Sequence, residues 1–211
     1  MDKIADIFII GGGINGAGIA ADAAGRGLSV ILCEQNDLAS ATSSASTKLI
    51  HGGLRYLEYY DFALVKKALK EREILLNAAP HIIEPLRFLL PLHKGLRPAW
   101  LIRLGLFIYD HMGGRKILPA TTSTNLNEGK YKDILKNQYI KAYEYSDCRV
   151  DDARLVVLNA MTARDHGAQI LTRHKCTSAV REDNHWLITL ENANNHKSYT
   201  IKAKALVNAA G

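Results

Sequence analysis

Apolar runs, small residues and turn residues follow one another in a regular order over residues 1–50. Residues 7–10 are all apolar and predict a buried strand of a parallel sheet. The Ala- and Gly-rich residues 19–26 predict a helix, and the apolar residues 30–32 predict a second strand. A strand, a helix and a parallel strand in this order form a βαβ unit, so this segment predicts an α/β domain.

Residues 56–148 follow a different pattern. Asp61 precedes apolar residues at positions 62, 65, 69 and 76, which is helical spacing after an N-cap. Prolines at 80, 85 and 91 then break the pattern. Residues 97–111 hold large apolar side chains at 100, 101, 104, 106, 107 and 108 and predict either a core helix or an amphipathic surface helix. Residues 113–140 are rich in Gly, Thr, Asn and Lys and predict a long loop.

The α/β pattern resumes at residue 149. Residues 151–165 predict a helix, because acids occupy its start and Gly167 lies just past its end. Four further strands are expected, the middle two as a small meander, over residues 168–176, 186–190, 199–201 and 205–209.

Together these patterns predict a discontinuous Rossmann-type domain. Its segments are residues 1–55 and 149–211, and the insertion, residues 56–148, contributes to a second, α+β substrate domain. The last predicted strand runs into a small-residue turn at which the chain stops. We therefore expect the chain to be a fragment of a longer protein, with an incomplete Rossmann-type domain.

Composition narrows the class of protein. The 211 residues, 47% of them hydrophobic, suffice for one core or for one domain plus part of another. The cysteines Cys33, Cys148 and Cys176 form no CxxC pair and indicate a reducing compartment without a disulfide framework. No spacing predicts a zinc site. The first apolar run is too short for a signal peptide, and no stretch has the length of a membrane span.

The charge balance is basic. The formal net charge is +6, with a pI near 9.2. This favours an anionic partner, such as a phosphorylated substrate, an acidic lipid or a nucleic acid. An unbalanced solvated surface explains the same numbers, so charge alone does not choose among them.

The strongest chemical signal is the glycine motif between the first predicted strand and helix. Gly11 suits a tight turn, Gly13 the approach of a pyrophosphate to the backbone, and Gly16 the packing of helix on strand. The helix N-terminus then offers N–H groups to the phosphates. Glu34 follows the second strand, where an acid accepts hydrogen bonds from a ribose and disfavours NADP. The motif alone does not separate NAD from FAD.

A second constellation follows over residues 39–56. Six hydroxyl side chains lie within residues 40–47, and the segment ends in His-Gly-Gly-Leu-Arg-Tyr. Hydroxyl and backbone N–H groups suit a pyrophosphate, two adjacent glycines allow close backbone approach, and Arg55 offers a planar fork to a phosphate or carboxylate. A mobile Ser-rich loop is the alternative, but it accounts less well for residues 51–56.

Residues 11–18, 42–56 and 144–156 carry a family resemblance. With residues 97–100, 109–111 and 207–211, they are similar to the FAD-dependent glycerol-3-phosphate dehydrogenases of aerobic bacteria. The resemblance runs along the whole chain, but proteins of that family are more than twice as long. It implies an FAD-binding Rossmann-type domain like those of glutathione reductase and D-amino-acid oxidase.

The resemblance also implies a reaction and its partners. The substrate would be sn-glycerol 3-phosphate, oxidised to dihydroxyacetone phosphate by hydride transfer to non-covalent FAD. Electrons would pass to a membrane quinone, either ubiquinone or menaquinone. The protein would lie peripherally on the inner face of the cell membrane, with residues 97–109 as a candidate docking helix. A homodimer is left open, and no nucleic acid is expected.

Residue roles come from the same resemblance. His51 would lie near the flavin ring, and Arg55 and Tyr56 would meet the substrate phosphate; a salt bridge for Arg55 and a hydrogen-bonded loop position for His51 stay open as alternatives. The residues expected to hold the cofactor are Gly11, Gly13, Asn15, Gly16, Glu34, Thr42, Ser43, Ser46, Lys48, Leu49, Cys176 and Gly211.

Two other functions remain at this point. One is a flavin oxidase for amino acids or hydroxy acids, which needs a clamp for a carboxylate in place of a phosphate. The other is a nucleotide-binding module without activity of its own.

Overall fold

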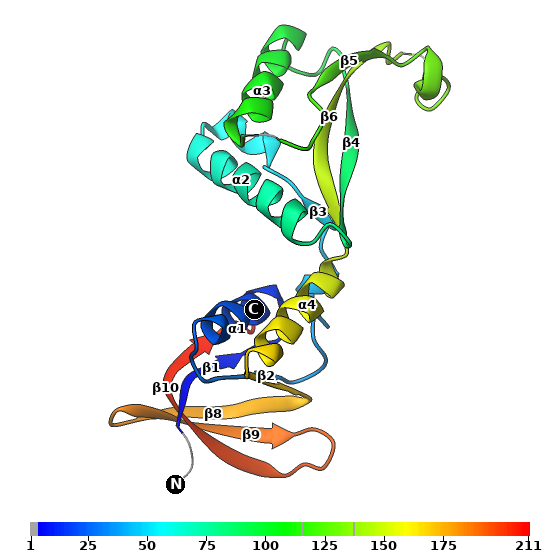
Figure 1. Ribbon diagram of the computed structural model, residues 1–211. Coiled ribbons are helices and arrows are strands. Elements are labelled where there is room, and N and C mark those ends of the chain that lie inside the picture. Colours follow the sequence, from blue (N-terminus) through cyan, green and yellow to red (C-terminus); the bar gives the residue numbers. More distant parts are fainter. Residues whose placement is uncertain (1–3, 115, 137) are drawn as a thin grey trace. The chain divides into compact units, whose positions relative to one another are not determined.

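The structure is a computed structural model that describes residues 4–114, 116–136 and 138–211 (Figure 1). These residues divide into two compact units. The first unit runs up to Thr47 and resumes at Asp151, and the second unit is Lys48–Val150. The sequence placed these boundaries at residues 55 and 149. Each unit is described by itself below.

The first unit is built on a six-stranded sheet in the order β7-β2-β1-β10-β9-β8. Strands β7, β2 and β1 pair in parallel, and β8, β9 and β10 form an antiparallel meander. The strand bounds are β1 Ala5–Ile10, β2 Val30–Glu34, β7 Gln169–Thr172, β8 His174–Glu182, β9 His185–Asn192 and β10 Ser198–Asn208.

Two expectations for these strands are wrong. The two strands expected over 199–201 and 205–209 are one strand, β10, which pairs with β9 up to Ala203 and with β1 from Ala203 onward. The single strand expected over 168–176 is two strands, because Arg173 adopts a left-handed conformation with φ 59° between β7 and β8.

Two helices, α1 (Ile14–Gly25) and α4 (Asp152–Asp165), pack side by side on one face of this sheet (Figure 1). Small residues such as Ala17 and Ala160 are fully buried where the helices meet, so the two backbones approach closely. The meander of β8, β9 and β10 folds back over the opposite face of the parallel strands, where Ile188 and Leu190 of β9 bury Phe8. The sheet core therefore has apolar contacts on both faces, as the apolar runs predict.

The second unit has a four-stranded antiparallel sheet with two helices packed against it (Figure 1). Its central strand β6 pairs with β3, β4 and β5. The bounds are β3 Leu49–Ile50, β4 Ile83–Pro91, β5 Thr122–Asn125, β6 Lys141–Val150, α2 Phe62–Ala78 and α3 Ala99–Met112; the short 3₁₀ helices are η1 Thr42–Ser44 in the first unit, and η2 Leu54–Tyr59 and η3 Gly129–Tyr131 in the second.

Helix caps are where the sequence predicts them. The Asp61 carboxylate accepts a hydrogen bond from the Leu64 N–H at the start of α2. The Asp151 carboxylate accepts one from the Arg154 N–H at the start of α4, and Gly167 follows that helix with φ 91°. Both helices therefore begin at residues that satisfy an unpaired backbone donor.

The structure also shows the state of the cysteines, the length of the helices and the grouping of possible metal ligands. Cys33, Cys148 and Cys176 are free thiols. None of the helices in the described part of the chain is long and apolar enough to cross a membrane. Among the same residues, no cluster of His, Cys, Asp and Glu could hold a metal ion.

Candidate functional site

The loop after β1 has the shape that the glycine motif predicts. Gly11 has φ 110°, and a Cβ there would lie 2.5 Å from the Ala209 carbonyl oxygen. A Cβ on Gly16 would clash with the Gly11 carbonyl oxygen, so helix α1 packs directly on the loop. A Cβ on Gly13 would lie 2.9 Å from Ser43 Oγ. The contacts at Gly11 and Gly16 are with backbone atoms and exclude larger side chains, whereas the contact at Gly13 is with a side chain.

Helix α1 begins at this loop with donors available for an anion. Its N-cap, Gly13, supplies no side-chain cap, and the first turn contains no acidic residue. The Ile14 N–H donates to Ser43 Oγ at 2.9 Å, whereas the next N–H groups have no acceptor inside a helix. Together with the helix dipole, they make a site that suits a phosphate.

Glu34, at the end of β2, is fixed by two backbone donors. The Gly12 N–H donates to Glu34 Oε2 at 2.8 Å, and the Asn36 N–H donates to Glu34 Oε1 at 2.8 Å. The carboxylate is thereby oriented beside the glycine loop, and each oxygen keeps acceptor capacity for a ribose hydroxyl.

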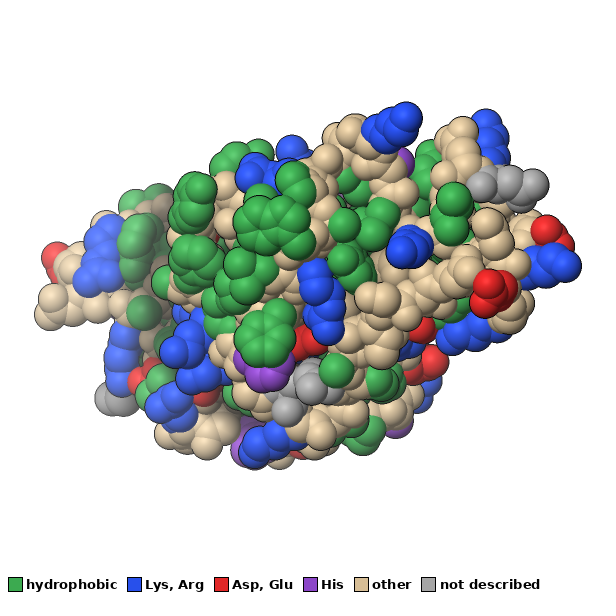
Figure 2. All heavy atoms as spheres, turned by 90° about the horizontal axis from the view of Figure 1, so that it is seen from above, with side chains coloured by type: hydrophobic (Ala, Val, Ile, Leu, Met, Phe, Trp, Pro, Cys, Tyr) green, Lys and Arg blue, Asp and Glu red, His purple; other side chains and the backbone are tan. Residues whose placement is uncertain are grey.

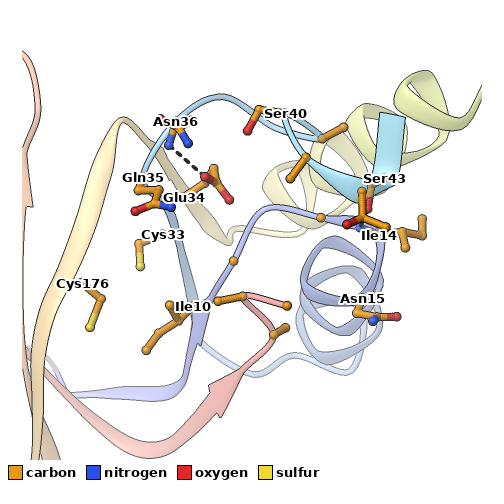
Figure 3. Close-up of a pocket in the computed structure, with 18 of the residues that line it drawn as sticks. Ile10, Ile14, Asn15, Cys33, Glu34, Gln35, Asn36, Ser40, Ser43 and Cys176 are labelled. Atoms are coloured by element: carbon orange, nitrogen blue, oxygen red, sulfur yellow. Dashed lines mark hydrogen bonds between the residues drawn. The ribbon is translucent and has the colours of Figure 1, made fainter. Parts of the chain in front are cut away.

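A cavity of about 420 Å³ opens at the carboxyl ends of β1 and β2 (Figure 3). In Figure 3, Glu34, Gln35 and Asn36 lie on one side of it and Ile14, Asn15 and Ser43 on another. This is the edge at which parallel α/β sheets bind nucleotides. Eight of the residues predicted to hold the cofactor line this cavity, namely Gly11, Gly13, Asn15, Glu34, Thr42, Ser43, Cys176 and Gly211.

Two thiols on the cavity wall, Cys33 and Cys176, are protonated and unreactive. Burial raises the pKa of Cys33 to about 12 and also raises the pKa of Cys176. Both side chains are therefore neutral apolar surface at ordinary pH, as suits the wall of a nucleotide site.

A second cavity, of about 480 Å³, lies within the second unit. His51, Arg55 and Tyr56 all line it, as does Leu49. Arg55 is exposed and forms no ion pair within the described part of the chain, so its guanidinium is available to an anion. Aromatic side chains complete the wall, namely Tyr59, Phe88 and Tyr145.

Buried polar groups lie behind the His51–Tyr56 segment. The Tyr109 hydroxyl accepts a hydrogen bond from the Gly52 N–H at 2.7 Å and donates to the Asp147 carboxylate at 2.8 Å. Arg72 Nη1 donates to Asp147 Oδ1 at 2.6 Å. Burial raises the pKa of Asp147, against the hydrogen bonds from Tyr109 and Arg72, which lower it. The same burial raises the pKa of Tyr109 far above its usual range, which keeps the hydroxyl protonated.

The remaining predicted residues have other positions. Ser46 donates its hydroxyl to the buried Asp152 at 2.7 Å, at the start of α4. The Lys48 carbonyl accepts a hydrogen bond from the Val150 N–H at 2.9 Å, and Lys48 itself has φ 56°. Neither residue lines the first cavity, and Gly16 acts there only through packing.

Several cavity residues were not foreseen from the sequence. Gln35 and Asn36 continue directly from β2, and His174 and Lys175 open β8 beside Cys176. Strand topology is the signal that could have found them, since the ends of neighbouring strands meet at one edge of a sheet. Tyr109 and Asp147 carried no such local signal, because they come from separate elements, α3 and β6.

Comparisons with known proteins agree with this geometry. A family model described as FAD dependent oxidoreductase matches residues 6–211. D-erythritol 1-phosphate dehydrogenase of Brucella abortus is 59% identical over 206 residues, which are 98% of this chain and 41% of that protein. Glycerol-3-phosphate dehydrogenase of Pseudomonas aeruginosa is 59% identical over 209 residues, which are 99% of this chain and 40% of that protein.

A solved structure is similar as well. The chain superimposes on the glycerol-3-phosphate dehydrogenase from Bacillus halodurans complexed with FAD with a TM-score of 0.73 and 32% identity. The match covers 99% of this chain and 34% of that one. The chain thus spans well under half the length of the proteins that it matches.

Proposed function

The chain belongs to the FAD dependent oxidoreductases, and we propose that its protein oxidises sn-glycerol 3-phosphate to dihydroxyacetone phosphate. Family membership confirms the fold class, the family resemblance and the FAD cofactor expected from the sequence. The substrate and the reaction are the proposal, since the chain spans about two fifths of its curated relatives.

The observation that carries the proposal is the pairing of two kinds of site in one chain. The first unit has a nucleotide cavity with glycines where a Cβ would intrude, a helix N-terminus and an oriented Glu34 carboxylate. The second unit has a cavity at which Arg55 is exposed and unpaired by any described acid. A flavin dehydrogenase for a phosphorylated alcohol needs both.

We propose a division of labour among these residues. Gly11, Gly13 and the α1 N-terminus hold the FAD pyrophosphate, and Glu34 holds the ribose. FAD would supply the hydride acceptor for the alcohol carbon, and the hydroxyl proton would leave to a basic group or to solvent. Arg55 grips the substrate phosphate with its planar fork, and Tyr56 adds a hydroxyl. His51 offers ring nitrogens to the substrate hydroxyls.

The remaining cofactor assignments are proposed in the same way. Asn15, Thr42 and Ser43 line the first cavity beside the glycine loop and suit the phosphates, and Cys176 and Gly211 also line this cavity. Ser46, Lys48 and Leu49 keep the flavin role that the family resemblance implies.

One relative favours a second substrate. The D-erythritol 1-phosphate dehydrogenase is as similar to this chain as the glycerol-3-phosphate dehydrogenase. Both substrates are phosphorylated polyols, so Arg55 would bind the phosphate of either. The two substrates differ in the number of carbon atoms. An oxidase for amino acids or hydroxy acids is less well supported by these two relatives.

The flavin spectrum of the full-length protein tests the proposal. Under anaerobic conditions, glycerol 3-phosphate should bleach the oxidised flavin band, whereas glycerol should not, because it lacks the phosphate. Stronger bleaching by D-erythritol 1-phosphate would reassign the substrate. Bleaching by an amino acid or a hydroxy acid alone would refute a phosphate-specific dehydrogenase.

We further propose that the enzyme lies on the inner membrane surface and passes electrons to a quinone. The support is the surface of α3, where Trp100, Leu104 and Phe107 are 69%, 47% and 52% exposed. On the face drawn in Figure 2, hydrophobic side chains gather with Lys and Arg side chains beside them. Such a surface suits an anionic bilayer.

A further inference from the structure

A chain of buried hydrogen bonds ends on the backbone beside His51. It runs from the Gly52 N–H to the Tyr109 hydroxyl at 2.7 Å and on to the Asp147 carboxylate at 2.8 and 3.0 Å. Tyr109 is 1% exposed and Asp147 is 4% exposed. The chain thus links α3 and β6 to a loop residue that itself carries no side chain.

The direction of each hydrogen bond is fixed. Arg72, which is 2% exposed, donates to Asp147 and to the Ser146 carbonyl oxygen, and its guanidinium lies 5.8 Å from the Tyr109 ring centre. This cation holds Asp147 in its acceptor form. The single hydroxyl proton of Tyr109 is then committed to Asp147, so only its lone pairs face the Gly52 N–H.

The backbone at Gly52 packs closely against Leu69 and Tyr109, so only glycine fits there. A Cβ on Gly52 would lie 2.9 Å from Tyr109 Cε2 and would also clash with the Leu69 side chain. Gly53 adopts the left-handed conformation with φ 70°, and the Tyr56 N–H donates to its carbonyl oxygen at 2.8 Å. Packing on one side and a hydrogen bond on the other therefore set the course of the chain from His51 to Arg55.

We propose that Tyr109 and Asp147 are positioning residues for the substrate site. They fix the Gly52 amide and thereby present His51 and Arg55 to the second cavity, which Asp147 also lines. The inference rests on the proposed function, in which Arg55 binds the substrate phosphate.

The net stability of the Arg72–Asp147 ion pair alone accounts poorly for this network. Buried ion pairs and their hydrogen bonds add little net stability over apolar residues of the same volume. An apolar core at these three side chains would leave the Gly52 amide without an acceptor, next to the residues that face the cavity. The network is thus suited to fixing a backbone position.

Tyr109→Phe in the full-length holoenzyme tests the inference, because it removes only the hydroxyl. The matched control is Tyr143→Phe, since Tyr143 is also buried and donates to the Ala99 carbonyl oxygen at 3.0 Å, away from the cavity. The measurements are flavin reduction by glycerol 3-phosphate and the thermal midpoint. We expect Tyr109→Phe to lower kcat/KM by roughly ten-fold or more and the control to change it little, at similar losses of midpoint.

A double-mutant comparison separates positioning from a general effect. In an Arg55→Ala background, Tyr109→Phe should cost less than in the wild type, because one of the two groups that it positions is gone. Asp147→Asn, which keeps the shape and removes the charge, should resemble Tyr109→Phe. Fully multiplicative losses, wild-type kcat/KM in both single variants, or loss of folding beyond that of the control would each overturn the inference. A wild-type flavin that glycerol 3-phosphate does not bleach would instead refute the proposed function.

Discussion

Three glycines of the motif that follows β1 are required for three different reasons. Gly11 is needed for its φ of 110°, and Gly16 for the close packing of α1 on the Gly11 carbonyl oxygen. Gly13 differs, because the atom that a Cβ would meet there is the Ser43 hydroxyl oxygen, which accepts a hydrogen bond from the first N–H of α1. Its replacement therefore tests cofactor binding more directly than replacement of the other two.

Gly13→Val is expected to abolish FAD binding. A Cβ there already lies 2.9 Å from Ser43 Oγ, and the two methyl groups would enter the path proposed for the pyrophosphate. The control is Gly18→Val in the same helix, where a Cβ would meet nothing within 4 Å. The measurement is the flavin released on denaturing each purified full-length variant. Normal flavin content in Gly13→Val would remove this loop from the cofactor site.

Arg55 tests the substrate half of the site. Arg55→Lys keeps the charge but loses the two-pronged hydrogen bonding, so KM for glycerol 3-phosphate should rise roughly ten-fold or more. Arg55→Ala should raise KM further. Arg149→Lys, at an exposed arginine of β6 outside the cavity, is the control. Kinetics that are unchanged in both Arg55 variants would show that another cation holds the phosphate.

Ion pairing between strands gives the first unit a predictable pH response. Asp6, at the start of β1, accepts hydrogen bonds from Lys204 Nζ of β10 at 2.7 Å and from the Ser29 hydroxyl at 2.7 Å. These partners hold the pKa of Asp6 well below its ordinary value of 3.8. As the pH falls, the folded state therefore binds fewer protons at Asp6 than the unfolded state does. This stabilisation is present above the ordinary pKa of 3.8 and is lost in stronger acid.

Asp6→Asn should therefore lower the thermal midpoint most at neutral pH. The difference from the wild type should shrink as the pH falls below about 4, because the Asp6 carboxylate of the unfolded wild-type chain then takes up a proton while the folded one stays charged. Asp133→Asn, at an exposed acid of the second unit, is the control. A difference that stays constant from neutral pH to strong acid would mean that the Lys204 pair contributes nothing through charge.

The helices and strands show which elements could be predicted from the sequence and which could not. Caps and apolar periodicity located α2 and α4, because those signals are local. Strand β4 was missed because Pro85 and Pro91 break the pattern, yet it is the edge of its sheet order, where a missing N–H costs little. Strand β6 was missed because polar residues such as Glu144 and Asp147 are buried in it. Only their partners from other elements make that burial tolerable.

The candidate sites divide in the same way. The glycine motif and Glu34 are close in sequence, so their shared cavity was predictable. The cavity of His51 and Arg55 depends on Phe88, Tyr145 and other residues from distant strands. No short motif predicts that these side chains line one cavity, because their proximity follows from the pairing of β4 with β6.

Taken as a whole, the molecule has a positive charge and an exposed apolar helix surface. The alternative expectation for residues 97–111, a helix buried in the core, holds only for part of α3. Leu106 and Tyr109 are buried, whereas Trp100, Leu104 and Phe107 are exposed. Arg97, just before the helix, is half-exposed and pairs with Glu58 at 3.4 Å. This combination can lie at the headgroup level of a bilayer.

Binding to vesicles tests the proposed membrane docking. Full-length protein should sediment with anionic vesicles at low salt, dissociate as salt is added, and ignore neutral vesicles, because each Lys or Arg near an anionic surface adds about 1 kcal/mol. Trp100→Ser with Phe107→Ser should weaken binding at all salt concentrations, since the loss is apolar. Ile74→Ser, at a residue of α2 that is 57% exposed, is the control. A protein that stays in the supernatant with anionic vesicles at low salt would refute membrane docking and leave the flavin chemistry intact. Equal binding by the α3 variants and the control would move the docking surface elsewhere on the protein.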